Sequence, residues 1–197
     1  LIGKPTQSDT IMNNPSVQAS SMAAPSTLER EGKADLAYVY SPATEAGAGL
    51  PLVMFCGGYR SDMSGTKATF LEQECAARGQ GYVRFDYTGH GQSGGKFEDC
   101  TLGTWLTDAI DVLEHVTGGP ALVVGSSMGG WIALLLARAR AGNVQGVLGL
   151  AAAPDFTEEL FARLDDGQKK DFAELGYAKI ENDYSDEPYH FTKALYD

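Results

Sequence analysis

One short stretch decides the fold of this chain: Val123-Val124-Gly125-Ser126-Ser127-Met128-Gly129-Gly130. An apolar run, Ala121 to Val124, leads into the pattern Gly-x-Ser-x-Gly, and a helical segment, Trp131 to Ala141, follows at once. This order of strand, serine and helix is typical of a nucleophile elbow, a tight turn that lifts a serine hydroxyl above the end of a sheet. The stretch therefore predicts an α/β fold that carries a reactive serine.

The spacing of the glycines selects one of the two adjacent serines. The nucleophile of such a turn is held in a strained backbone conformation, and the residues two places before and after it are crowded together. Gly125 and Gly129 stand at these places around Ser127, whereas Ser126 would have bulky residues at both. We therefore predict Ser127 as the nucleophile. On this pattern alone, a glycine-rich turn without chemistry stays open as an alternative.

A second glycine motif, Gly57-Gly58-Tyr59, follows the apolar run Leu52 to Cys56. Acyl transfer requires hydrogen-bond donors aimed at the oxygen that gains charge in the tetrahedral intermediate. In this kind of site one N–H group comes from the residue after the nucleophile, here Met128, and another from the loop after an earlier strand. We therefore predict that the backbone N–H groups of Tyr59 and Met128 form an oxyanion hole.

Apolar runs and amphipathic segments alternate along the middle of the chain, which indicates βαβ units and a parallel sheet with helices on both faces. Residues 1–30 are expected to be a disordered tail, 31–153 the N-terminal part of the α/β core and 154–197 the start of a cap. The cap is expected to open with one helix over residues 156–175 and to contain no further strand. The expected strands are 35–40, 52–56, 81–86, 121–124 and 145–151, and the expected helices are 66–78, 101–116 and 131–141.

Composition excludes several classes of partner. The net charge of −11 argues against nucleic acid or an anionic membrane as the main partner. No apolar run approaches the length of about 18 residues that a membrane span requires. The three cysteines are an odd count without a Cys-x-x-Cys pair, which favours a reducing compartment and indicates no metal site.

A third glycine-rich stretch, Asp86-Tyr87-Thr88-Gly89-His90-Gly91-Gln92-Ser93-Gly94, contains the pattern Gly-x-Gly-x-x-Gly after a strand. Such a pattern invites a dinucleotide-binding interpretation. That site needs a helix that starts at the third glycine, but residues 95–100 intervene. The acidic residue about 20 positions further on would be Glu114, which falls inside a predicted helix. We therefore expect no cofactor.

These three motifs resemble the α/β-hydrolase superfamily, in its serine aminopeptidase-like branch. The resemblance covers roughly Asp35 to Asp197, and it departs from other branches where Gly57 replaces a histidine. It implies an α/β-hydrolase fold, the cytoplasm or, in a eukaryote, the mitochondrial matrix, and a small-molecule or acylated-protein substrate. Two wider runs, Gly65-Thr66-Lys67-Ala68 and Arg84-Phe85-Asp86-Tyr87, are most similar to mitochondrial acyl-protein thioesterases and acyl-glucuronide esterases and to their bacterial relatives.

The acid and base of a catalytic triad are harder to find. In this superfamily the triad runs serine, acid, histidine in chain order. His90 and His115 precede the serine. We expect His90 in a surface loop, with a place at the border of the site as the alternative, and His115 in a structural position. His190 follows the serine but lies in the cap-like segment, and the acid candidates are Asp155, Asp183 and Asp186. We therefore expect the acid and base beyond Asp197, in strands and helices that this chain lacks.

The sequence thus predicts a serine hydrolase, similar to carboxylesterases and thioesterases (EC 3.1), that cleaves an ester or thioester through an acyl-enzyme at Ser127. The activity of this piece itself is expected to be low, because a serine without a base is a poor nucleophile. The alternative is a non-catalytic binding protein with the same fold. An intact elbow argues against it, because a binding module has no use for that strain.

Overall fold

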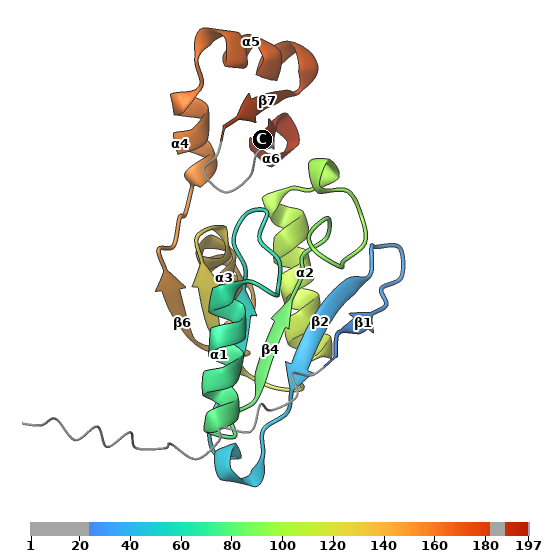
Figure 1. The fold of residues 1–197 in the computed structure, drawn as a ribbon, viewed down its shortest axis with the longest axis vertical. Coiled ribbons are helices and arrows are strands. Elements are labelled where there is room, and N and C mark those ends of the chain that lie inside the picture. The colour runs from blue at the N-terminus through green and yellow to red at the C-terminus, as the bar shows by residue number, and fades with distance from the viewer. Residues whose placement is uncertain (1–23, 182–187, 197) are drawn as a thin grey trace, which may run out of the picture.

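The computed structural model describes residues 24–181 and 188–196 of the chain. Six strands form one sheet in the order β1-β2-β4-β3-β5-β6, and helices cover both of its faces (Figure 1). The strands β4, β3, β5 and β6 run parallel, whereas β2 is antiparallel to both of its neighbours. The predicted α/β-hydrolase fold with a mostly parallel sheet is confirmed.

The strands of this sheet are β1 (Ser26–Leu28), β2 (Leu36–Ser41), β3 (Leu52–Cys56), β4 (Tyr82–Phe85), β5 (Ala121–Ser126) and β6 (Val144–Leu150). The helices beside it are α1 (Thr66–Ala77), α2 (Leu102–His115) and α3 (Met128–Ala139), with short 3-10 turns η1 (Glu45–Gly47) and η2 (Phe97–Asp99). The remaining elements, which we call the cap, are α4 (Phe156–Arg163), α5 (Asp166–Leu175), β7 (Tyr177–Ile180), β8 (Tyr189–Thr192) and α6 (Lys193–Tyr196).

Strand β3 shows why the sheet is buried from both sides. Successive side chains of a strand point to opposite faces. Met54 and Cys56 belong to the core cluster that includes α2 and α3, whereas Val53 and Phe55 belong to the cluster that includes α1. The continuous apolar run of β3 follows from this double burial. Cys56 is in register with Gly125 of β5, so the loop after β3 and the turn after β5 emerge side by side.

The expected disordered tail does not extend to residue 30. Residues 1–23 lie outside the described residues, so for them the tail stays a prediction. From residue 24 the chain is ordered, because β1 pairs with β2 in antiparallel register, Leu28 opposite Leu36. The boundary at residue 30 was wrong, since hydrogen bonds to the next strand and the buried Arg30 described next fix this segment.

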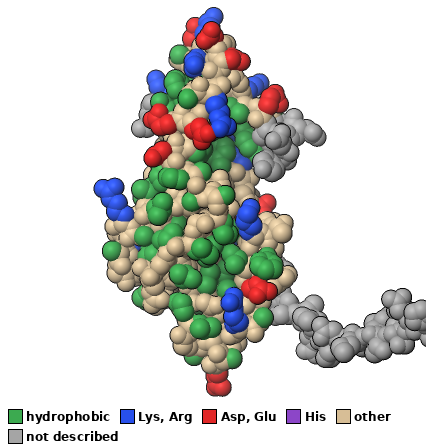
Figure 2. Space-filling model, turned by 90° about the vertical axis from the view of Figure 1, so that its left-hand side faces the viewer, with side chains coloured by type: hydrophobic (Ala, Val, Ile, Leu, Met, Phe, Trp, Pro, Cys, Tyr) green, Lys and Arg blue, Asp and Glu red, His purple; other side chains and the backbone are tan. Residues whose placement is uncertain are grey.

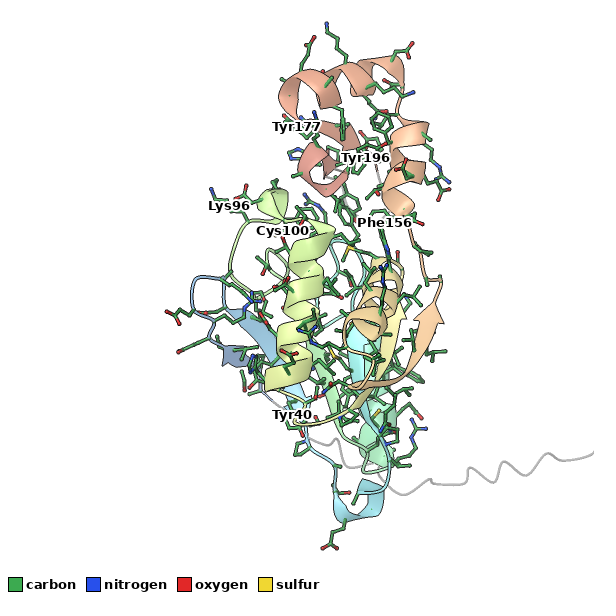
Figure 3. All side chains as sticks on the ribbon, turned by 180° about the vertical axis from the view of Figure 1, so that it is seen from behind. Tyr40, Lys96, Cys100, Phe156, Tyr177 and Tyr196 are labelled. Carbon is green, nitrogen blue, oxygen red and sulfur yellow. The ribbon has the colours of Figure 1, made fainter. Side chains whose placement is uncertain are left out.

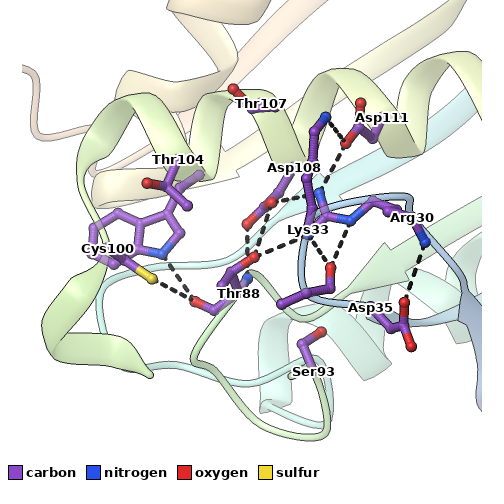
Figure 4. Close-up of polar contacts among 12 residues, drawn as sticks. Arg30, Lys33, Asp35, Thr88, Ser93, Cys100, Thr104, Thr107, Asp108 and Asp111 are labelled. Carbon is purple, nitrogen blue, oxygen red and sulfur yellow. Dashed lines mark hydrogen bonds and ion pairs between the residues drawn. The ribbon is translucent and has the colours of Figure 1, made fainter. Parts of the chain in front are cut away.

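Arg30 anchors the chain to α2 through a buried ion network (Figure 4). Its Nη1 lies 2.7 Å from Asp108 and 2.9 Å from Asp111, and Lys33 lies 2.8 Å from Asp111. The side chains of Arg30 and Asp108 are only 5% and 2% exposed. Asp108 also accepts a hydrogen bond of 2.7 Å from the backbone N–H of Thr88. The network therefore joins the N-terminal segment, α2 and the loop after β4.

The cap differs from the expected single helix without strands. The helix breaks after Arg163, because Asp165 caps a new helix with a reciprocal bond to Gln168. The strands β7 and β8 then form a two-stranded antiparallel sheet. The expectation of no further strand was wrong, because two strands of four residues are too short to show a period. Tyr196 and three phenylalanines, Phe161, Phe172 and Phe191, pack together as the cap's own core.

Strand β6 lies at the edge of the described sheet. Figure 2 faces this side and shows hydrophobic side chains gathered over the body below the cap. Leu148 of β6 and Leu134 of α3 are 50% and 49% exposed. The strand is partly covered, because Val147 and Leu150 pack against the core clusters while Leu148 lies open.

All three cysteines are buried free thiols. In the described part of the chain, none of the helices combines the length and hydropathy that a membrane crossing requires.

Candidate active site

Ser127 occupies the tight turn between β5 and α3 in an unusual backbone conformation. Its φ and ψ are 54° and −121°, a region that non-glycine residues avoid at a cost of about 1–3 kcal/mol. Two backbone bonds tie it to β6 and the residues that follow: its N–H donates to Leu150, and its carbonyl accepts from Ala153, both at 3.1 Å. Its carbonyl also accepts from Gly130 of α3 at 2.9 Å. The end of β6 and the segment after it therefore help to fix the strained serine.

The flanking glycines are required by close backbone contacts. A Cβ atom on Gly125 would lie 2.2 Å from the carbonyl oxygen of Gly129. A Cβ on Gly129 would lie 2.1 Å from the carbonyl oxygen of Cys56 and 2.3 Å from that of Gly57. These contacts are with backbone, which cannot rotate away. The crowding predicted around Ser127 is thus present, and it involves the end of β3 as well as the turn itself.

The two serines differ in access. Ser127 is exposed, whereas Ser126 is only 8% exposed at the end of β5. Both serines line a cavity of about 340 Å³ between the loop after β3 and the start of α1, and Ser127 is the more exposed of the two. The cavity is lined on one side by Gly58 and Tyr59 and on the other by Thr66 and Lys67, among other residues. A ligand in this cavity can reach the hydroxyl of Ser127.

The two proposed donor groups lie beside this serine. A Cβ on Gly58 would sit 3.5 Å from the Cβ of Ser127, so loop 57–61 lies against the serine. A bond of 3.1 Å from Ser61 N–H to the Gly58 carbonyl closes this loop into a turn around Tyr59 and Arg60. Met128 is the first residue of α3, where an N–H group has no acceptor within the helix. Sequence reasoning placed these residues together, and their catalytic roles stay predictions.

The side chain of Tyr59 has a second role that the sequence did not reveal. Its hydroxyl donates a 3.0 Å hydrogen bond to the backbone carbonyl of His190 in the cap. Its ring packs against Phe156 at the junction of cap and core (Figure 3) and against Tyr189, with centroid distances of 5.7 and 5.9 Å. Burial raises the pKa of Tyr59 to about 12, so the phenol keeps its proton and remains a donor. Tyr59 thus connects the loop beside Ser127 to the cap.

Tyr59→Phe is expected to lower kcat for p-nitrophenyl acetate by less than tenfold. The change removes one hydrogen bond, which contributes about 0.5–1.5 kcal/mol, but it keeps the backbone N–H that we assign to the oxyanion hole. Steady-state kinetics measures the effect. The control is Tyr177→Phe on strand β7, which removes a phenol hydroxyl from the cap itself. A loss of 100-fold or more would show that the phenol itself takes part in the chemistry.

His90 was expected in a surface loop, and this was wrong. It is 4% exposed, surrounded by the rings of Tyr87, Phe97 and Trp105 at 5.7, 5.0 and 5.2 Å. Both of its ring nitrogens have partners, each at 3.2 Å: Nδ1 the Thr88 carbonyl and Nε2 the Arg60 N–H. Its polar atoms are satisfied inside the protein, so burial of the ring is tolerated.

None of the three histidines contacts the serine. His115 is exposed at the end of α2, and the ring of His190 packs against Tyr177 at 4.7 Å. Among residues 24–181 and 188–196, the hydroxyl of Ser127 has no hydrogen-bond partner. Asp155 is exposed at the N-terminus of α4 in a left-handed conformation, and the acid candidates Asp183 and Asp186 lie outside the described residues.

The glycine-rich stretch after β4 is a closed turn. Asp86, which is 1% exposed, accepts bonds from the backbone N–H groups of Met63 and Gln92 at 2.6 and 2.8 Å. A Cβ on Gly91 would lie 2.2 Å from this carboxylate. The glycines therefore let the loop wrap around Asp86, and α2 begins only at Leu102. This geometry leaves no helix N-terminus at the third glycine for a dinucleotide.

Comparison with known proteins agrees with this fold. A family model described as "Alpha/beta hydrolase family" matches residues 49–193. The mitochondrial palmitoyl-protein thioesterase ABHD10 of Bos taurus is 39% identical over 137 residues, which are 70% of this chain and 45% of that protein. The human protein of the same name gives the same identity and coverage. The chain spans about half the length of the curated relatives it matches.

Two solved structures are similar over most of the chain. A putative hydrolase from Agrobacterium vitis S4 has 40% identity and a TM-score of 0.79, over 88% of this chain and 69% of that one. The mouse α/β-hydrolase domain-containing protein 10 has 32% identity and a TM-score of 0.75, over 86% of this chain and 67% of that one. The chain belongs to the α/β-hydrolase family.

Proposed function

We propose that this chain carries the nucleophile and oxyanion hole of a serine hydrolase that cleaves an ester or thioester. The observation that supports it best is the exposed Ser127 in a strained strand-to-helix turn, facing a cavity. Strain of this kind persists at functional sites, where the surrounding structure enforces it. A binding protein without catalysis, the alternative, gives no reason to keep it.

In the proposed reaction, the Ser127 oxygen attacks the carbonyl carbon while a general base takes its proton. The N–H groups of Tyr59 and Met128 stabilise the oxyanion that forms. The carbon–oxygen or carbon–sulfur bond then breaks, and the base returns the proton to the leaving alcohol or thiol. Water attacks the acyl-enzyme in the same way and releases the acid. Because His90, His115 and His190 are all placed elsewhere, we expect the base to come from outside residues 1–197.

The relatives support a thioester as the substrate class. The bovine and human relatives are named palmitoyl-protein thioesterases, and we propose an acylated protein or a small acyl thioester as the substrate of this chain. A thioester needs only weak leaving-group assistance, because a thiol has a pKa near 8.5. The buried free thiols are consistent with a reducing compartment, the cytoplasm or the mitochondrial matrix of a eukaryote.

A fluorophosphonate probe tests the proposal on the product of the complete gene. The probe forms a covalent phosphonate ester with an activated serine, and we expect the adduct on Ser127. Fragmentation mass spectrometry must distinguish it from the adjacent Ser126. A labelled Ser126, or no labelling of an active protein, would contradict the assignment.

A further inference from the structure

The loop that carries the Tyr59 N–H has an unusual backbone. Arg60, the next residue, has a φ of 53°, in the left-handed region that favours glycine. A side chain in this region is strained, so surrounding contacts must hold it. The N–H of Arg60 does not take part in the bond that closes the turn, which runs from Ser61 to Gly58. It donates instead to Nε2 of His90 at 3.2 Å.

The hydrogen bonds of His90 define its tautomer. The Thr88 carbonyl can only accept, so the proton must lie on Nδ1, which is 3.2 Å away. The Arg60 N–H can only donate, so Nε2 must offer its lone pair. Both bonds therefore exist together only in the neutral ring protonated at Nδ1. A proton on Nε2 would remove the support of Arg60.

The environment keeps His90 in this form. Burial lowers the pKa of His90 to about 4, and the positive charge of Arg60 acts in the same direction. The other ionisable groups around the ring are Glu98, paired with Arg60 at 3.4 Å, Asp62 and Tyr189 in the adjoining cavity, Tyr87 against the ring, and Asp108 bonded to Thr88. The ring thus remains a neutral acceptor at neutral pH.

The carbonyl that holds His90 is itself fixed by the core. The Thr88 oxygen also accepts from the indole N–H of Trp105 at 3.1 Å. The Thr88 N–H donates to Asp108, which the buried Arg30 neutralises (Figure 4). A continuous series of buried bonds therefore runs from Arg30 through Asp108, Thr88 and His90 to the backbone of loop 57–61.

We propose that His90 is a positioning residue for the oxyanion hole: it holds the Arg60 N–H and so keeps the preceding Tyr59 N–H aimed at the substrate oxygen. The inference rests on the proposed function. It assigns no proton transfer to His90, which lies before the serine and does not contact it. A small displacement of a donor has a large effect on rate, up to roughly 10²-fold for about 1 Å.

A pair of amide substitutions separates the two bonds of His90. In His90→Gln, the side-chain amide reaches about as far as Nε2 and can accept from Arg60. In His90→Asn, the shorter amide reaches only to the position of Nδ1, so it can donate to the Thr88 carbonyl but cannot accept from the Arg60 N–H. We expect His90→Asn to lower kcat for p-nitrophenyl acetate roughly 10- to 100-fold with KM changed less than threefold. His90→Gln is expected to stay within about fivefold of the wild type, since it keeps the acceptor.

The control is His115→Asn, because His115 is an exposed histidine at the end of α2. Its kcat and KM should match those of the wild type. Equal rates for His90→Asn and His90→Gln would overturn the proposal, as would a His90→Asn variant with an unchanged kcat. If Ser127→Ala retains activity, the proposed function fails instead, so the two failures are distinct.

A measurement on the unmutated protein needs no variant to fold. Long-range nitrogen–proton NMR spectra of the product of the complete gene report the tautomer of each histidine. We expect His90 to be neutral and protonated at Nδ1 at pH 7. A His90 ring protonated at Nε2 cannot accept from Arg60, and that result would overturn the inference.

Discussion

Ser127→Ala is expected to lower kcat for an activated ester by about 10⁶-fold, the scale seen when the serine of a catalytic triad is removed. The substitution deletes the attacking oxygen but keeps the Tyr59 and Met128 N–H groups, so a residual rate of about 10³–10⁴ over water is expected to remain. The measurement is kcat with p-nitrophenyl acetate, on the product of the complete gene, since we expect the base outside residues 1–197.

Ser126→Ala is the matched control, because it removes a serine hydroxyl from the adjacent residue. Ser126 is 8% exposed, so its hydroxyl has little access to a substrate. We expect this variant to retain fluorophosphonate labelling at Ser127. A Ser127→Ala protein that keeps more than about 1% of its activity would refute the assignment of the nucleophile, given the loss stated above.

Arg30→Met is expected to destabilise the protein by about 3–5 kcal/mol, because it leaves the carboxylate of Asp108 buried without its partner. The free energy of unfolding in urea measures this loss. Lys33→Met is the matched control: Lys33 is 46% exposed and pairs with Asp111 in the same network. An exposed ion pair contributes about 0–1 kcal/mol. Equal losses in the two variants would contradict the buried role of Arg30.

The destabilisation by Arg30→Met should depend on pH. Burial already raises the pKa of Asp108, while bonds from Thr88 and Arg30 lower it in part. Removal of Arg30 raises the pKa further, so the folded variant binds a proton more readily than the unfolded chain. Stability linked to a raised pKa is present at low pH and is lost as the pH rises through the folded pKa. The deficit should therefore be smaller at pH 5 than at pH 8.

Local patterns were sufficient for most of the core. The alternation of apolar runs and amphipathic segments predicted the parallel strands and the helices between them. The predicted helix over 101–116 agrees with α2, whose N-cap is Thr101 in a capping box with Thr104. The glycine spacing around Ser127 could be read directly because Gly125 and Gly129 approach each other within the turn itself, although Gly129 also meets the distant end of β3.

Features that depend on distant partners were not readable. His90 is buried because the Arg60 N–H, 30 residues away, satisfies its Nε2. Arg30 is ordered because of carboxylates 78 and 81 residues later. No local pattern marks either pairing. The break between α4 and α5 was missed although a local pattern marks it, because Asp165 and Gln168 have the spacing of a capping box.

The position of Tyr59 has a consequence for how this fold can diversify. Its main chain lies in loop 57–61 beside Ser127, and its hydroxyl is bonded to the His190 carbonyl of the cap. The cap partner is a backbone oxygen, which every amino acid at position 190 supplies. Sequence drift in the cap can therefore change the side chain at position 190 without breaking this bond. A cap transplanted from another family member should keep this bond whenever the graft returns a strand carbonyl to the same place.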